Sequence, residues 1–332
     1  MDTIKVSVIC MVYNHEKFIR KCLDGFIMQK TNFKYEVLIN DDASIDNSAY
    51  IIKEYENKYP DLIKPIYQEE NQFSKNKSIA KDILVPLAKG KYIAFCEGDD
   101  YWIDENKLQR QYDIMESNSE YSLCVHNTIR HDLLGKRKDE LFNNWPNLYV
   151  LNEEDVFLGW FVHTSSYFFR KEALLYAYSI SGYWCGDFLR ITLAYDFGKI
   201  IYLNNIMSIY NYNNINGVTY TNTNNDYQII ICKENKRKDY LEEFNKFTQK
   251  RHNSIILKKI SQIDFLIIQI EIDNANNMQE FNKKKKELKN NVFFKHYLSH
   301  LNMMKRLLVL LKYNNFYLYK FYKKTYWRIK NA

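Results

Sequence analysis

The sequence predicts an α/β fold with a doubly wound, mostly parallel sheet, helices on both faces, and a C-terminal helical extension. Two observations lead to this prediction. Short β-branched runs alternate with amphipathic helical segments from residue 4 to about residue 222, and such alternation favours a parallel sheet. Beyond residue 225 the pattern changes to Lys, Glu, Asn, Leu and Ile at helical spacing, without Gly or Pro, which predicts helices.

The first half of the predicted domain covers residues 1–103. Strands are expected at residues 5–12, 35–39, 63–67 and 91–96, and helices at residues 18–26, 49–60 and 79–88. The last strand is apolar on both faces, as in the middle of a parallel sheet. It delivers the polar segment Glu97-Gly98-Asp99-Asp100.

The second half of this domain covers residues 104–222, and the helical extension covers residues 223–332. A helix is expected to begin with Asp104 as its N-cap, and a second one to open at Gly186-Asp187. Further strands are expected at residues 121–126, 165–170 and 200–212.

Composition indicates a cytoplasmic protein without a bilayer-spanning segment. The six cysteines are scattered without a CxxC pair, so we interpret them as reduced thiols. The apolar run at residues 6–13 is followed by polar residues and no cleavage site, which indicates a buried strand and not a signal peptide. Other apolar runs fall far short of the roughly 20 residues that cross a bilayer.

The charge is distributed unevenly along the chain. Residues 281–332 hold 14 Lys and Arg against one acid, a local charge of +13, so residues 1–280 carry −6 of the net +7. This distribution argues against a nucleic-acid groove across the main domain. The basic tail, interleaved with aromatics and leucines, predicts either a helix lying on an anionic membrane surface or a helical hairpin packed on the rest of the chain or on a second subunit of a homo-oligomer.

Three polar clusters follow predicted strands: Tyr13-Asn14, Asp41-Asp42, and the segment from Glu97 to Asp100. In an open α/β sheet the ligand crevice lies at the carboxyl ends of the strands. Carboxylates that converge there repel one another unless a cation or a hydrogen-bonding ligand offsets their charge, so the pattern predicts Mg²⁺ or Mn²⁺ and a polar ligand. The alternative for each cluster is ordinary turn chemistry.

Four motifs in order carry a resemblance to a known family. They are Val6-Ser7-Val8-Ile9 with Tyr13-Asn14, the run Asp41-Asp42-Ala43-Ser44-Ile45-Asp46, the strand from Gly90 to Phe95, and Glu97-Gly98-Asp99-Asp100-Tyr101-Trp102. Over roughly residues 4–220 the chain resembles the family 2 glycosyltransferases of the GT-A fold. The resemblance implies inverting transfer of a sugar from a nucleotide diphosphate donor, most simply a UDP-sugar, to a glycan or lipid-linked acceptor in bacterial surface polysaccharide assembly.

The resemblance also implies roles for residues of the donor site. Asp42 is expected to accept a hydrogen bond from the nucleobase, with Tyr13 beside the base. Asn14, Lys81 and Asp100 are expected to bind the same donor. Asp99 is expected to ligate the metal that bridges the diphosphate, and Glu97 to face the ribose or a metal-bound water.

On the acceptor side the resemblance points to Asp187 as the general base at the start of a helix. The alternative is that Asp187 only caps that helix. His163 and Trp102 are candidates for contacts on the acceptor side. The alternative for His163 is a purely structural histidine. The alternative for Trp102 is a core residue behind the metal loop.

The chain departs from the family pattern after the last strand of the domain. Relatives often carry an Arg and a His there, whereas this chain reads Tyr210-Asn211-Tyr212-Asn213-Asn214-Ile215-Asn216-Gly217, which leaves room for Lys or Asn at the diphosphate. A nucleotidyltransferase would need a glycine-rich loop that residues 10–17 lack. The remaining rival is a non-catalytic carbohydrate-binding or scaffold protein on the same fold.

Overall fold

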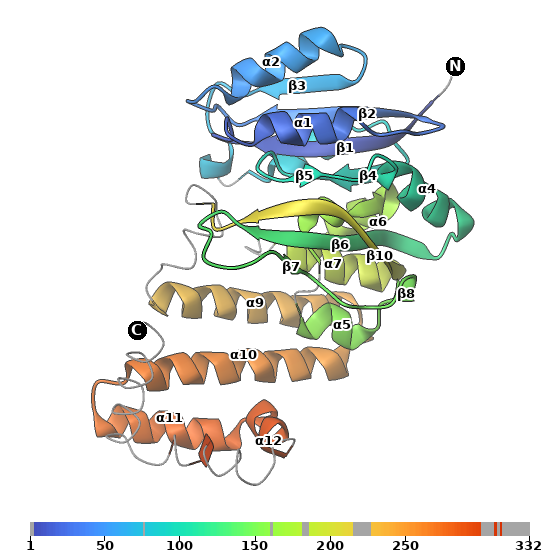
Figure 1. Ribbon diagram of the computed structural model, residues 1–332. Coiled ribbons are helices and arrows are strands. Elements are labelled where there is room, and N and C mark those ends of the chain that lie inside the picture. Colours follow the sequence, from blue (N-terminus) through green and yellow to red (C-terminus); the bar gives the residue numbers. More distant parts are fainter. Residues whose placement is uncertain are drawn as a thin grey trace. The chain divides into compact units, whose positions relative to one another are not determined.

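The computed structural model describes residues 3–75, 77–159, 162–180, 186–214, 227–299, 309–310 and 313. The chain divides into two compact units, Met1–Asn224 and Asn225–Ala332, and Figure 1 traces both with their elements labelled. Each unit is described by itself.

The first unit is built on a ten-stranded sheet. Its strands are β1 (Ile4–Val12), β2 (Lys34–Asp41), β3 (Ile63–Tyr67), β4 (Tyr92–Phe95), β5 (Tyr101–Trp102), β6 (Tyr121–Asp132), β7 (Glu140–Leu141), β8 (Tyr149–Val150), β9 (Phe168–Arg170) and β10 (Lys199–Tyr212). Its helices are α1 (Ile19–Ile27), α2 (Ser48–Lys58), η1 (Phe73–Lys75), η2 (Ile79–Leu84), α3 (Val85–Leu87), α4 (Lys107–Ser117), α5 (Glu153–Leu158), η3 (Thr164–Ser166), α6 (Lys171–Ala177) and α7 (Gly186–Phe197).

The strand order is β3-β2-β1-β4-β9-β6-β10-β5, with β7 beside β6 and β8 beside β10. Strands β3, β2, β1 and β4 are parallel, and β6 pairs in parallel with β10. The short strand β9 joins these two groups through antiparallel pairing with β4 and β6. In Figure 1, α1 lies in front of β1, whereas α6 and α7 lie behind β6 and β10. The predicted α/β fold is therefore confirmed.

The core between α1 and the sheet explains why this half of the chain folds as it does. Ile19, Cys22, Leu23 and Phe26 form the buried face of α1, at the spacing of an amphipathic helix. Gly25 lies on the same face, where a β-carbon would come within 2.9 Å of the Trp102 carbonyl oxygen. The helix can approach β5 this closely only because that position is a glycine.

The local structure differs from the sequence prediction in two places. Residues 79–88 contain one turn of π-helix, η2, before the short α3. Asp104 is not the N-cap of α4, since Asn106 holds that position and donates its backbone N–H to Asp104 Oδ1 at 2.8 Å. The carboxylate therefore orders the turn that precedes the helix.

The second unit is helical in its described residues, with α9 (Tyr227–Phe247), α10 (Asn253–Asn274), α11 (Met278–Asn290) and α12 (Val292–Ser299). Residues from α10, α11 and α12 share one apolar cluster: Ile268, Ile272, Ala275, Phe281, Leu288, Phe294, Leu298 and Tyr313. The buried apolar residues of α11, Phe281 and Leu288, both pack in this core.

The described part of the chain contains no helix that is both long and apolar enough to cross a membrane. Most of the predicted basic tail beyond Ser299 lies outside the described residues.

Candidate active site

The loop after β1 and the loop after β2 hold each other in place at the carboxyl edge of the sheet. Asn14 adopts a positive φ of 56°, which an asparagine tolerates better than most residues. Its backbone N–H donates to Ser44 Oγ, and its side-chain Oδ1 accepts from the Ile45 backbone, both at 2.9 Å. The side chain of Asn14 therefore fixes the loop, while the neighbouring Tyr13 ring is 44% exposed.

The two adjacent aspartates after β2 are both buried but differ in their partners. The Asp42 carboxylate accepts backbone N–H groups of Gln72 at 2.8 Å and Phe73 at 3.0 Å. Asp41 Oδ2 accepts from the Ser44 backbone at 3.2 Å, whereas its Oδ1 has no hydrogen-bond partner within the described ranges. Burial raises the pKa of Asp41. Asp42 thus anchors the loop at residues 70–75 with acceptor sites to spare, because a carboxylate offers about four.

The acidic segment after β4 requires a glycine at its second position. A β-carbon on Gly98 would lie 2.8 Å from His15 Nδ1 and 2.8 Å from Val12 Cγ2. Such a contact is too short for any side chain. The segment can therefore turn against the end of β1 only with Gly98 in place.

Asp99 is contacted by residues from two other strand ends. Its Oδ2 accepts from Asn214 Nδ2 at 3.1 Å and lies 3.9 Å from His15 Nε2. Asn211, in β10, donates its side-chain amide to the Asp99 backbone carbonyl. The stretch that lacks the family's Arg and His thus supplies two asparagines to this aspartate, while Ile215 to Gly217 lie outside the described residues.

Asp100 is 2% exposed and faces inward. Its Oδ1 accepts the Asn211 backbone N–H at 2.9 Å, and its Oδ2 lies 3.5 Å from His163 Nδ1. Burial and the neighbouring Asp99 raise the pKa of Asp100 well above its usual range, and burial lowers the pKa of His163 to about 4. The contacts of Asp100 with Asn211 and His163 hold the acidic segment against β10.

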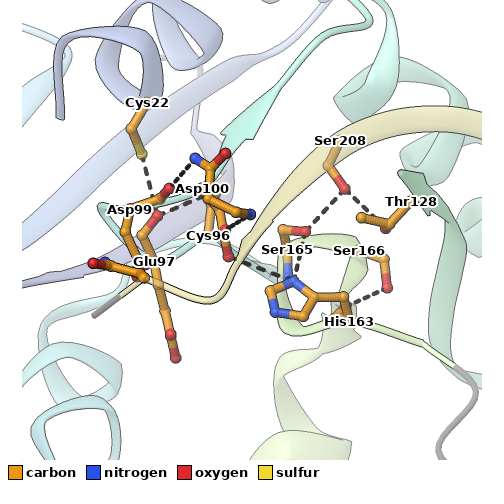
Figure 2. A network of polar contacts seen from close by, with 12 residues as sticks. Cys22, Cys96, Glu97, Asp99, Asp100, Thr128, His163, Ser165, Ser166 and Ser208 are labelled. Atoms are coloured by element: carbon orange, nitrogen blue, oxygen red, sulfur yellow. Dashed lines mark hydrogen bonds and ion pairs between the residues drawn. The ribbon is translucent and has the colours of Figure 1, made fainter. Parts of the chain in front are cut away.

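His163 belongs to a polar network that runs into the sheet (Figure 2). Its Nδ1 accepts the backbone N–H of Ser165 at 3.3 Å and lies 3.0 Å from Ser165 Oγ. From there Ser208 Oγ and Thr128 Oγ1 continue the chain of hydroxyls in steps of 2.9 Å. The ring also stacks on Tyr210, with centroids 4.0 Å apart. Because Nδ1 accepts, the neutral ring carries its proton on Nε2.

Asp187 lies in the first turn of α7, where the helix dipole favours a negative charge. It forms an ion pair with Arg190, one turn further along the helix. The Asp187 side chain is 40% exposed and that of Arg190 is 10% exposed. The carboxylate is thus open on one side and backed by a buried cation.

The carboxylates of the two halves of the domain influence one another. Burial, together with the charges of Asp99 and Asp187, raises the pKa of Glu97 to about 8, while Arg190 opposes the rise. Asp187 and Asp99 likewise oppose the lowering of the His163 pKa. The geometric link between the two halves is Arg190, which pairs with Asp187 and lies 5.3 Å from the ring of Phe95, at the end of the strand that leads to Glu97 and Asp99.

Lys81 lies apart from the contacts of this cluster. Its Nζ donates to the Tyr178 carbonyl at 3.1 Å and lies 5.9 Å from the centre of that ring. Lys81 thereby links η2 to the residue that ends α6.

Trp102 fills the core behind the acidic segment. It is 2% exposed, packs edge-on against Phe26 with centroids 4.9 Å apart, and donates Nε1–H to the Ser165 carbonyl at 3.0 Å. The ammonium group of buried Lys107 lies 4.0 Å from the ring centre. No face of the indole is open to a sugar, so the acceptor-side role is wrong and the core alternative holds.

Sequence reasoning missed three residues of this site. His15 directly follows the pair Tyr13-Asn14 in the loop after the first strand, and this position was the signal that could have identified it. Asn214 lay in the stretch recognised as unusual, but no pattern singled out which asparagine would contact Asp99. Arg190, three residues after Asp187, carried the helical spacing of an ion pair, and this signal was available from the sequence.

Comparisons with known proteins agree with this geometry. The chain is 36% identical over 167 residues to an uncharacterized protein of Mycobacterium bovis, a match that covers 50% of this chain and 47% of the relative. It is also 31% identical over 135 residues to WfgD of Escherichia coli, named as a UDP-Glc:α-D-GlcNAc-diphosphoundecaprenol β-1,3-glucosyltransferase. This match covers 39% of this chain and 50% of WfgD. The chain thus spans about half the length of these curated relatives.

A solved structure shows the same fold. Residues 1–349 of Staphylococcus aureus TarS, solved with UDP-GlcNAc, superpose with a TM-score of 0.55 at 17% identity, and the match covers 86% of this chain and 80% of that 1–349 chain. The family model described as glycosyl transferase family 2 matches residues 7–177, just over half of the chain, and this range contains the strand ends that carry Asn14, Asp42 and Glu97 to Asp100. The chain therefore belongs to glycosyl transferase family 2.

Proposed function

We propose that the protein transfers a sugar from a nucleotide diphosphate donor, a UDP-sugar in the simplest case, to a glycan or lipid-linked acceptor with inversion at the anomeric carbon. The observation that carries this proposal is that the start of α7, with Asp187, lies close to the end of β4, which leads to Glu97 and Asp99: Arg190 pairs with Asp187 and lies 5.3 Å from the Phe95 ring. Donor and acceptor groups must meet at one point for a single displacement.

The donor side follows the strand ends. The exposed Tyr13 ring offers a face for the nucleobase, and Asp42 lies buried at the neighbouring strand end with acceptor sites to spare. Asn14 and Asp100 act by holding the two loops in shape, as their backbone contacts indicate. Lys81 serves the donor from η2, next to the Tyr178 carbonyl.

The residues around Asp99 fit a divalent cation that takes most of its ligands from a diphosphate. Burial, and next the charges of Asp99 and Asp187, raise the pKa of Glu97, and a nearby cation would offset the second of these effects. No group of three or more metal-ligating side chains is found among the described residues, and Mg²⁺ or Mn²⁺ at phosphate sites commonly uses one or two carboxylates. Asp99 would hold the ion, which as a Lewis acid offsets charge on the leaving phosphate.

The acceptor side is assigned to Asp187 and His163. As the acceptor oxygen bonds to the anomeric carbon and the bond to the diphosphate breaks, Asp187 accepts the hydroxyl proton. Its position in the first turn of α7 and its 40% exposed side chain leave the carboxylate open to an acceptor. The Nε2–H of neutral His163 is a hydrogen-bond donor for a sugar hydroxyl in the same site.

The second unit has a separate proposed role. Three lysines of α11, Lys283, Lys286 and Lys289, are exposed, whereas Phe281 and Leu288 are buried in the core of the unit. An anionic membrane surface on the cytoplasmic side would then be contacted through charge and not through inserted apolar residues. The alternative is a packing or dimerisation element.

The test uses the full chain with UDP-glucose and UDP-GlcNAc in the presence of Mn²⁺. We expect release of UDP from at least one donor. Asp187→Asn should lower this turnover by roughly 10²- to 10⁴-fold with donor affinity nearly unchanged. An equal loss of donor affinity would reduce Asp187 to a helix cap, and absence of UDP release with every common sugar nucleotide would favour the non-catalytic alternative.

A further inference from the structure

Arg190 is the buried cation of an acidic site. Its side chain pairs with Asp187 in the first turn of α7 and is only 10% exposed. A guanidinium that is removed from water needs compensating contacts. These contacts show what Arg190 does.

The guanidinium of Arg190 lies between the two halves of the domain. One of its terminal nitrogens pairs with Asp187 Oδ1, in the first turn of α7. Its centre lies 5.3 Å from the ring of Phe95, the last residue of β4. Since Phe95 is two residues before Glu97, a single side chain ties the helix of the proposed base to the strand of the donor site.

The contacts of Arg190 leave the Asp187 carboxylate open. Asp187 is 40% exposed although its partner is buried, so the cation backs the carboxylate without covering it. Planar guanidinium also restricts the orientation of a carboxylate more than an ammonium group does.

We propose that Arg190 is a positioning residue that holds the Asp187 carboxylate in place, so that its exposed side meets the acceptor hydroxyl. This inference rests on the proposed role of Asp187 as the base. Arg190 itself touches neither substrate nor reacting atoms in this scheme. It acts through Asp187, which distinguishes the proposal from a purely structural role.

The experiment is a double-mutant cycle on the full chain with Arg190→Met and Asp187→Asn. Turnover is measured as UDP release from UDP-glucose and UDP-GlcNAc with Mn²⁺, and UDP affinity by calorimetry. Lys199→Met is the matched control, because it removes one exposed ion pair, with Glu120, on the surface. Thermal unfolding of each variant reports on the fold.

We expect Arg190→Met to lower turnover by roughly 10²-fold, with UDP affinity changed less than about threefold. In the Asp187→Asn background the same substitution should cost less than about threefold, because two residues that act as a unit are not additive. Arg190→Lys should recover part of the activity, and Lys199→Met should match the wild type.

Equal losses from Arg190→Met in both backgrounds, or a parallel loss of UDP affinity, would overturn the proposal. If Arg190→Met does not fold, the same cycle is run with Arg190→Lys, and additive losses overturn the proposal there too. An inactive Asp187→Asn with an unaffected Arg190→Met removes only this inference. Full turnover by Asp187→Asn removes the assigned base as well.

Discussion

Two charged regions of the chain differ in how their charge is held. At the edge of the sheet, Asp99 and Asp100 are contacted by Asn211, Asn214 and His163. On α11, Lys283, Lys286 and Lys289 are exposed. The first region is held by contacts within the fold, and the second is an exposed helical face.

This difference determines how much a single charge contributes. Buried charges act in a low effective dielectric and cannot be replaced by water, so that loss of one charge has a large effect. Exposed charges are screened by salt and add up in small increments. The three predictions below test that contrast in order of expected effect.

The largest effect is expected for Asp99→Asn. This substitution keeps the shape of the side chain but removes the charged ligand proposed for the cation, so transfer should be abolished and donor binding weakened. Calorimetry with UDP, with and without Mn²⁺, should show that the Mn²⁺-dependent part of the affinity is lost. Asp139→Asn is the control, since Asp139 is an exposed partner of His131.

Full activity of Asp99→Asn, or of the wild type in excess chelator, would contradict the metal-dependent scheme. An effect of the same size for Asp139→Asn would show that the contrast between the two kinds of charge is wrong.

The fold was predictable because its signals are local. Alternating apolar runs and helical spacing predicted β1, β2, β3 and β4 with their helices, and the polar strand ends predicted the edge that carries Asn14, Asp42 and Glu97 to Asp100. Two-residue strands such as β7 and β8 were not predicted, since their pairing with β6 and β10 comes from tertiary contacts and not from a periodic pattern.

The partners of the site residues were harder to predict than the residues themselves. The contacts of Asp99 with His15 and Asn214 join positions 84 and 115 residues apart along the chain, and no local pattern encodes them. The same holds for burial of Trp102, which depends on the close approach of α1 at Gly25. Sequence patterns thus predicted which elements meet, but not which hydrogen-bond and packing partners the side chains between them find.

A smaller effect, on stability, is expected at Lys107, a fully buried cation beneath the acidic segment. Burial lowers its pKa to about 7, against about 10.4 in an unfolded chain. Between these values the unfolded state binds more protons than the folded state, so stability rises with pH. The gain approaches about 1.4 kcal/mol per pH unit above pH 7.

Lys107→Met should make the slope of stability against pH less positive than in the wild type, since the opposing contribution of Glu97, whose pKa is raised to about 8, is common to both proteins. The measurement is the free energy of unfolding in urea at pH 7, 8 and 9 for the wild type, Lys107→Met and Lys30→Met. Lys30 is an exposed partner of Glu105, so its variant should keep the wild-type slope. Parallel pH profiles for all three proteins would mean that Lys107 is not the group that titrates.

The smallest effect per charge is expected on α11. If the exposed lysines contact an anionic membrane, each contributes about 1 kcal/mol near the surface. Replacement of Lys283, Lys286 and Lys289 by Gln should then weaken binding of the full chain to vesicles with anionic lipid by about 10²-fold at low salt. The difference should shrink as salt rises, because such contacts are screened.

A triple replacement of the exposed Lys58, Lys77 and Lys89 in the first unit controls for net charge. Equal losses for both triples, or no vesicle binding at low salt, would leave α11 as a packing or dimerisation element.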